Sequence, residues 1–283
     1  MLFLILSIIC SVSVGVIFKL ARNYSISISQ IVAANYLFAL VLCYFFSSPD
    51  LTAIGVDAPW GIYISLGVLL PSIFLFLALS IKYMGIVKTD AAQRLSLFIP
   101  ILAAWSLFGE KFNSLKIAAF GIAFPALLLI LNKPLGNTKN KWIYPAIVLV
   151  GFGLIDILFK QIALFTNLRY TTSLFIVFAL ALVLMTAVVG FEVGFKKAKL
   201  NYKNLLFGGL VGIFNFGNIL FYLKAHQSFA QNPSTVFAGM NMGVIVIGSL
   251  TGIFIFKEKL SKMNYAGLFL ALGAIALIVM SQQ

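Results

Sequence analysis

Charged residues are scarce in this chain. Only 10% of its 283 residues are Asp, Glu, Lys or Arg, whereas 62% are hydrophobic. Soluble domains carry roughly 25% charged and roughly 45–50% apolar residues. This composition excludes a water-soluble fold, because the chain has too little polar surface for solvent. A bilayer accepts it and requires backbone groups to be bonded within helices. The sequence therefore predicts an all-α polytopic membrane protein.

Residues that do chemistry are also few. The chain has one histidine and seven acids, and it contains neither a paired-carboxylate motif nor a His-x-x-x-His motif. We therefore expect no enzyme activity, no catalytic residue, no metal and no cofactor. No Gly-x-x-x-x-Gly-Lys-Ser/Thr loop occurs, so ATP is excluded as a direct driver. The two cysteines, Cys10 and Cys43, lie inside predicted helices and say nothing about redox compartment.

The net charge of +13 does not indicate nucleic acid, because the basic residues are scattered between apolar segments and form no patch. The expected partners are the lipid bilayer and a small-molecule substrate. Most basic residues fall on odd-numbered connections between the predicted spans. The positive-inside rule places that side in the cytoplasm and both termini outside.

Ten apolar runs are long enough to cross a hydrocarbon core, which takes about 20 residues. The predicted spans are residues 1–21, 28–46, 60–84, 86–108, 114–131, 142–165, 170–191, 203–228, 232–256 and 262–281. Very short breaks between the third and fourth spans and between the eighth and ninth predict tight antiparallel hairpins.

The second half of the sequence repeats the first. Phe18-Lys19 returns as Phe159-Lys160, Gly67 and Phe76 as Gly212 and Phe221, and Glu110-Lys111 as Glu258-Lys259. Each half holds five predicted spans, and an odd number places the halves upside down relative to one another, as in many secondary transporters. We predict two inverted five-helix repeats, residues 1–131 and 142–283, joined by a linker at 132–141.

Each half also ends alike, with residues 107–112 (LFGEKF) and 255–260 (IFKEKL) between a long apolar span and a final span rich in small residues. This pattern resembles the drug/metabolite transporter superfamily, specifically the ten-span EamA-type proteins. The resemblance covers nearly the whole chain. It implies an exporter or exchanger in the bacterial inner membrane, monomeric or homodimeric, for amino acids, drugs or other metabolites. Relatives carry sugars and nucleotide sugars.

The resemblance differs from the residues at two points. It implies a proline kink in the fourth span, which Pro100 supplies, but the matching residue of the second half is Gly248. It also implies that both termini are cytoplasmic, whereas the distribution of basic residues places them outside. Orientation stays open at this stage.

Asp156 and Lys160 are the first candidate site residues, since an ionisable group inside a membrane is a functional candidate by default. They lie one turn apart on the sixth span and share a face. Either they neutralise each other as an ion pair, or Lys160 binds a substrate carboxylate or phosphate while Asp156 holds the lysine or binds an amine. Asp156 is also the candidate for proton coupling.

Uncharged polar residues inside the spans complete the candidate site. Gln93 and Asn241 occupy matching positions of the two halves, and Arg94 follows Gln93. Such residues either bind polar groups of a substrate or bond neighbouring helices. Asn215, Asn218 and Tyr222 share one face of the eighth span, whereas the matching third-span positions are apolar, which favours a site.

These observations predict a secondary transporter that exports or exchanges a small polar metabolite, an amino-acid-like zwitterion or an organic anion. Transport would proceed by alternating access and be driven by protons or exchange. The alternatives are a sugar, sugar-phosphate or nucleotide-sugar exchanger, an integral membrane enzyme, or a passive channel.

Overall fold

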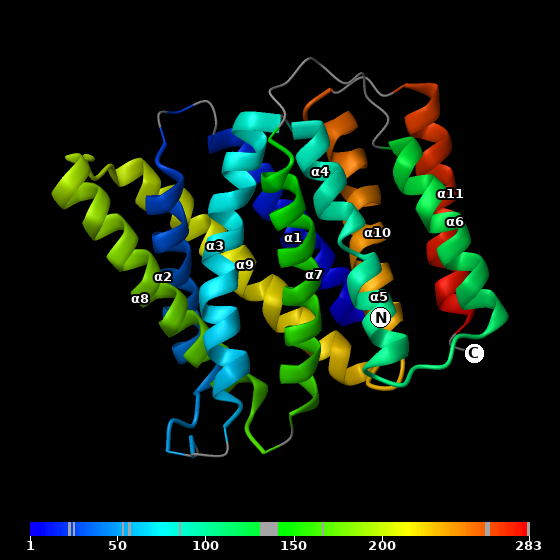
Figure 1. Ribbon diagram of the computed structural model, residues 1–283, viewed down its shortest axis with the longest axis horizontal. Helices are drawn as coiled ribbons and strands as arrows, with labels where there is room; N and C mark the ends of the chain where they lie inside the picture. Colours follow the sequence, from blue (N-terminus) through cyan, green and yellow to red (C-terminus); the bar gives the residue numbers. More distant parts are fainter. Residues whose placement is uncertain are drawn as a thin grey trace.

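The computed structural model describes residues 1–21, 24, 26–52, 54–55, 58–84, 86–130, 141–165, 167–257 and 261–281. Regular structure in these ranges is helical. The helices are α1 (Leu2–Ala21), α2 (Ile28–Ser47), α3 (Trp60–Met84), α4 (Ile86–Leu95), α5 (Phe98–Ser106), α6 (Ser114–Ile130), α7 (Ile143–Leu164), α8 (Tyr170–Lys196), α9 (Tyr202–Ser228), α10 (Pro233–Phe254) and α11 (Lys262–Met280). Figure 1 shows them as one bundle, with α8 and α2 at one end and α6 and α11 at the other.

Eight of these helices are long and apolar enough to cross a membrane, and α6 is a shorter apolar helix. Their outward side chains are also apolar: Phe46, Phe195, Phe254 and Phe269 are each more than three quarters exposed. Water would penalise such a surface, whereas hydrocarbon does not. The architecture is that of an integral membrane protein, as the composition predicts.

The predicted span at 86–108 is wrong as one continuous helix, because it is divided into α4 and α5. Pro100 has no N–H to donate to the carbonyl of Ser96, one turn earlier. That carbonyl instead accepts from Ile99 N–H at 3.0 Å, while the Ser96 hydroxyl donates to the Gln93 carbonyl at 2.6 Å. The chain therefore turns at Ser96-Leu97, where the sequence implied only a kink.

The other predicted spans agree with the helices to within a few residues at their ends, except that α8 continues to Lys196. The hairpins are present: α4 begins two residues after α3 ends, and α10 begins five residues after α9 ends. The predicted linker at 132–141 lies outside the described residues except for its last one. Residues 258–260 of the second LFGEKF-like motif lie outside them as well.

Close helix approaches depend on glycine at two positions of α9. A Cβ atom on Gly208 would lie 2.7 Å from the carbonyl oxygen of Ile31, and one on Gly212 would lie 2.7 Å from that of Asn35. Backbone atoms cannot give way as a flexible side chain does. The glycine spacing therefore brings α9 against α2, as small residues do in membrane bundles.

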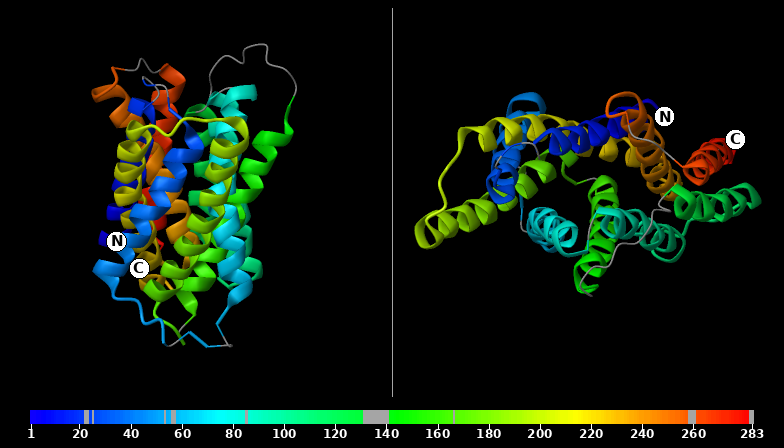
Figure 2. Two further views of the ribbon diagram at one scale, coloured as in Figure 1. Left: turned by 90° about the vertical axis from the view of Figure 1, so that its left-hand side faces the viewer. Right: turned by 90° about the horizontal axis from the view of Figure 1, so that it is seen from above.

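At the far end of the bundle, α6 and α11 run antiparallel. Asn113, just before α6, donates its amide to the carbonyl of Ser281 after α11, at 3.0 Å. Asn264 in the first turn of α11 donates to the carbonyl of Leu129 near the end of α6, also at 3.0 Å. Figure 2, seen from above, shows this pair set apart from the α1, α7 and α9 centre.

Candidate binding site

A cavity of about 610 Å³ lies among α1, α3, α4, α7, α9 and α10. Seven of the eight residues that sequence analysis singled out line it. They are Gln93, Arg94, Asp156, Asn215, Asn218, Tyr222 and Asn241. These side chains come from four helices, α4, α7, α9 and α10, so the fold brings together what the sequence only places on separate spans. The eighth candidate, Lys160, lies elsewhere.

The cavity occupies one half of the bundle's depth. Its lining reaches the last turns of two helices, at Lys19 of α1 and Ile81 of α3, and it continues past α10 to Phe256. Toward the other face, the described lining residues stop at Ser11 on α1 and at Met240 on α10. The cavity therefore extends to the face where α1, α3 and α10 end, which we call the open face, and stops short of the opposite, closed face.

Asp156 lies near the middle of α7 and contacts α9 across the cavity. The hydroxyl of Tyr222 donates a hydrogen bond of 2.8 Å to Oδ1 of Asp156. Within the described part of the chain, Tyr222 is the sole hydrogen-bond partner of this carboxylate. The ring of Tyr222 is itself held edge-on against Phe159 and His226. The site thus presents a positioned carboxylate to the cavity, and its second oxygen is available to a ligand.

Two amides of α9 line the same wall. Asn215 donates to Oδ1 of Asn35 on α2 at 3.1 Å. Asn218 accepts from the Ser7 hydroxyl through its side chain at 2.7 Å and its carbonyl at 3.0 Å. These residues bond neighbouring helices and also line the cavity, and binding of a substrate by them stays a prediction.

The matched amides Gln93 and Asn241 both line the cavity, from α4 and α10. Asn241 donates to the carbonyl of Phe237 in its own helix at 3.1 Å. Gln93 lies just before the break between α4 and α5, next to Arg94. The break places a guanidinium group, an amide and the Ser96 residue at the cavity within four positions of the chain.

Lys160 does not have the expected position. Its side chain is fully buried and donates to the carbonyls of Ala230 at 2.9 Å and His226 at 3.4 Å, at the C-terminal end of α9. Asp156 and Lys160, both within the described residues, form no ion pair with each other. The ion-pair reading is therefore wrong, and Lys160 lies outside the described cavity lining, which on α7 ends at Phe159. A role of Asp156 in binding an amine stays a prediction.

Sequence analysis also missed a buried ion pair. The Nζ of Lys116 lies 2.6 Å from Oε1 of Glu110, and both side chains are at most 3% exposed. In the sequence Glu110 stands out only as part of the repeated Glu-Lys pair. Lys116 is the third residue of a predicted span, and a charge there is the signal that could have found the pair.

Lys19 is a further residue at the cavity. Its Nζ lies 3.7 Å from the centre of the Phe256 ring, near the open face. It lies in the last turn of α1, and it is one of the residues that line the cavity. The described lining thus includes cations from α1 and α4 and the carboxylate of α7.

Comparison with known proteins gives a relative but no named activity. A protein of Haemophilus influenzae, described as uncharacterised, is 42% identical over 282 residues, covering 96% of this chain and 95% of its own. The chain belongs to the family of this Haemophilus influenzae protein. No family model matches the sequence. A solved crystal structure has a TM-score of 0.74 at 11% identity, covering 99% of this chain and 96% of its own, which shows a shared fold.

Proposed function

We propose that the chain is a secondary transporter that carries a small polar metabolite through the cavity by alternating access. The observation that carries this proposal is the cavity itself. It places a positioned carboxylate and several amides in the middle of an apolar bundle, and it reaches only one face. A carrier in one of its two resting states has this form, whereas a channel needs a continuous path.

The charges of the cavity favour an amino-acid-like zwitterion. Asp156 lies in the middle of α7, while Lys19 lies in the last turn of α1 near the open face. A substrate amine would bind the carboxylate of Asp156, and its carboxylate would bind a cation nearer the open face. Phe159 and Phe152 are among the apolar lining residues and would contact an apolar side chain. Charge-assisted hydrogen bonds are the strong ones in such a site.

Inverted repeats are part of the proposal, and helix contacts support them. In the proposed repeat, α1, α2 and α3 match α7, α8 and α9, the pair α4–α5 matches α10, and α6 matches α11. The contact of α2 with α9 then corresponds to that of α8 with α3. The contact of α1 with α10 corresponds to that of α7 with α4. The matched glycines agree: a Cβ on Gly67 would lie 2.6 Å from Leu180 of α8, just as Gly212 meets α2. The antiparallel α6 and α11 are also matched helices.

Membership of the drug/metabolite transporter superfamily and a place in a bacterial inner membrane complete the proposal. The LFGEKF-like endings and the Pro100 break carry the resemblance. The Haemophilus influenzae relative is bacterial, and outer-membrane spanning proteins are β-barrels rather than helical bundles. A helical member therefore belongs in the inner membrane.

A second candidate substrate class is an organic anion such as a sugar phosphate. Lys19 and Arg94 both line the cavity, against Asp156 as the acid of the described lining. This excess of positive charge favours a ligand with a net negative charge. The two substrate classes predict different effects of replacing Asp156. Transport of a zwitterion needs its carboxylate, whereas transport of an anion does not.

The test is a screen of labelled metabolites in proteoliposomes, with and without a pH gradient. The panel contains amino acids, sugars, sugar phosphates and carboxylates, and the protein is compared with its Asp156→Asn variant. We expect uptake of an amino acid that depends on Asp156. Uptake of a phosphorylated anion that Asp156→Asn leaves intact would favour the second class. Absence of uptake across the panel, from correctly folded protein, would contradict the proposal.

A further inference from the structure

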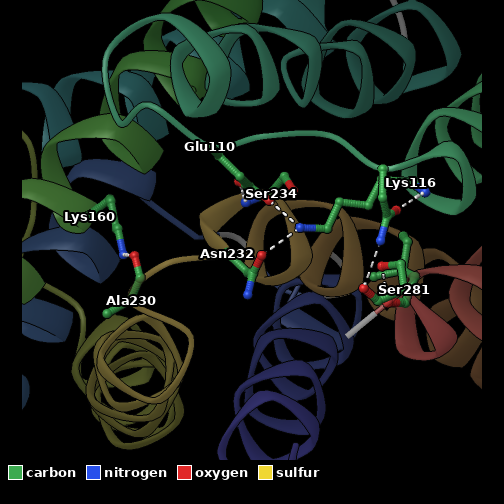
Figure 3. A network of polar contacts seen from close by, with 9 residues as sticks. Glu110, Lys116, Lys160, Ala230, Asn232, Ser234 and Ser281 are labelled. Atoms are coloured by element: carbon green, nitrogen blue, oxygen red, sulfur yellow. Dashed lines mark hydrogen bonds and ion pairs between the residues drawn. The ribbon is translucent and has the colours of Figure 1, made fainter. Parts of the chain in front are cut away.

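Polar side chains gather a second time in the bundle, on the side where the cavity stops. The ion pair of Glu110 and Lys116 links the segment after α5 to the first turn of α6. Figure 3 shows both side chains pointing toward the start of α10. They come from the first half of the chain, and their partners come from the second. The cluster therefore ties the two halves together.

Glu110 makes three contacts, two of them to Ser234 at the beginning of α10. Its Oε2 accepts from the backbone N–H of Ser234 at 2.8 Å, and its Oε1 accepts both the Ser234 hydroxyl at 2.5 Å and the Lys116 ammonium. The ammonium of Lys116 also donates to Oδ1 of Asn232 at 2.6 Å. A carboxylate at a helix N-terminus is favoured by the helix dipole. Both residues of the ion pair thus form hydrogen bonds with the N-terminal end of α10.

Lys160 extends the cluster to the end of α9. Its bonds to the carbonyls of His226 and Ala230 place a positive charge where the helix dipole is negative. Figure 3 shows Lys160 directed at Ala230, on the other side of the α9–α10 connection from Lys116. Charges from α6 and α7 therefore hold both ends of this connection.

The cluster lies between the cavity and the closed face. Ser234 precedes Met240, the first cavity residue on α10, by six residues, which is about 9 Å at about 1.5 Å per residue. Lys160 directly follows Phe159, which lines the cavity. A solute leaving toward the closed face would have to separate the beginning of α10 from Glu110 and Lys116.

We propose that the buried cluster of Glu110, Lys116 and Ser234 is the gate that closes this face, and the inference deepens the proposed transport function. The bonds from Lys116 to Asn232 and from Ser234 to Glu110 form only when α10 lies against the α5–α6 segment, which stabilises the closed arrangement. Separation leaves the ion pair to be hydrated by water entering from that face. A buried pair that loses its partners is costly, so the gate has two discrete states.

The matching positions of the other half carry different residues at two of the three places. In the proposed repeat, Lys116 corresponds to Asn264 and Ser234 to Ile86, at the spacing that relates Glu110 to Glu258. Asn264 bonds Leu129 and Ser261, and an isoleucine side chain has no group for a carboxylate. The gate is thus an asymmetric addition to a repeated fold.

The test measures cysteine modification rates in lipid nanodiscs, where a charged thiol reagent reaches both faces. The background replaces Cys10 and Cys43. One reporter is Ala238→Cys, at a fully buried α10 position between the cluster and the cavity, and the other is Ala78→Cys on the cavity wall. No solute is added. The reporters are combined with Glu110→Gln, or with Lys111→Gln at the exposed neighbouring residue as a control.

We expect Glu110→Gln to raise the rate at residue 238 by about ten-fold or more and to lower the rate at residue 78. A loss of about 1.4 kcal/mol from the closed arrangement gives a ten-fold population change. Ser234→Ala, which removes one hydroxyl, should give smaller changes of the same signs, and Lys111→Gln should give none. Opposite signs distinguish a gate from damage to the fold.

Unchanged rates in both variants would overturn the gate, and so would rates that rise at both reporters, because the cluster would then be structural only. Since no solute is present, the result does not depend on the flux screen. A negative screen together with opposite rate changes would leave the gate and remove the proposed transport. A positive screen with unchanged modification rates would support the proposed transport and remove the gate.

Discussion

The two faces of the bundle use the same chemical groups in different ways. At the cavity, Asp156 accepts one hydrogen bond from a hydroxyl, that of Tyr222, and faces open space. At the closed face, Glu110 accepts from a hydroxyl, a backbone N–H and an ammonium group while only 3% exposed. The protein thus gives one of these carboxylates a single hydrogen bond beside a cavity and surrounds the other with donors.

This difference separates binding from stability. Groups that the protein satisfies internally should matter chiefly for folding and for the closed arrangement. Groups that face the cavity should matter chiefly for a ligand and little for folding, because their missing partners come from outside. Substitutions at the two faces should therefore affect different measurements.

The largest effect is expected for Lys116→Met at the closed face. This change removes the ammonium group and leaves the carboxylate of Glu110 buried without its counter-ion. Breaking a buried pair in this way costs about 3–5 kcal/mol. Thermal unfolding of the detergent-solubilised protein should show a clear fall in midpoint. Lys111→Met, at the exposed neighbouring residue, is the control and should leave the midpoint unchanged.

The second effect is expected at the cavity, for Asp156→Asn. Solute exchange should fall by about ten-fold or more, since a hydrogen bond to a charged group is worth about 1.5–3 kcal/mol. The unfolding midpoint should stay close to that of the parent protein, because asparagine still accepts from Tyr222. Asp50→Asn, at an exposed carboxylate, is the control. A large fall in the unfolding midpoint with normal exchange would contradict the account, because Asp156 would then matter for folding rather than for binding.

A third effect tests helix packing, which both faces share. Gly212→Ala places a methyl group 2.7 Å from the carbonyl of Asn35, and overpacking of this kind costs about 1–3 kcal/mol. Gly121→Ala, on α6 with no atom within 4 Å of the added methyl group, should be neutral or slightly stabilising. Equal stability of the two variants would contradict the close approach of α9 and α2.

The smallest effect is expected for Tyr222→Phe. This variant removes the hydroxyl that orients Asp156 and keeps the ring packed against Phe159 and His226. A single hydrogen bond contributes about 0.5–1.5 kcal/mol, so the affinity of the transported solute should fall a few-fold. The KM of uptake should rise with little change in maximal rate. No change in KM would mean that Tyr222 does not position the carboxylate.

Much of the fold could be predicted from the sequence because hydropathy decides which segments enter a membrane. The nine unbroken predicted spans correspond to helices. The break at Ser96 was not predicted. The sequence shows that Pro100 cannot donate to the carbonyl of Ser96, but it does not show that Ile99 N–H donates to that carbonyl or that the Ser96 hydroxyl donates to the carbonyl of Gln93. A proline inside a span can kink a helix or divide it, and neighbouring contacts decide between the two outcomes.

The site was predicted in part, for a related reason. Polarity inside an apolar span identified Asp156, Tyr222 and the amides, and the fold places them together at one cavity. It also suggested an Asp156–Lys160 pair, because a spacing of four residues puts both on one face. That spacing does not show how far each side chain lies from the cavity or which carbonyls of other helices lie near it. In the structure Lys160 donates to carbonyls at the end of α9 instead. The cluster around Glu110 and Lys116 was not predicted, because its partners on α10 lie more than a hundred residues away in the sequence.

Counterflow tests the central claim, a solute-binding cavity exposed to one face at a time, most directly. Proteoliposomes are loaded with an unlabelled amino acid that the screen identifies, and the entry of labelled amino acid is followed. The account predicts that internal solute accelerates entry and that Asp156→Asn abolishes this acceleration. Entry that is equally fast without internal solute, or that Asp156→Asn leaves unchanged, would contradict it.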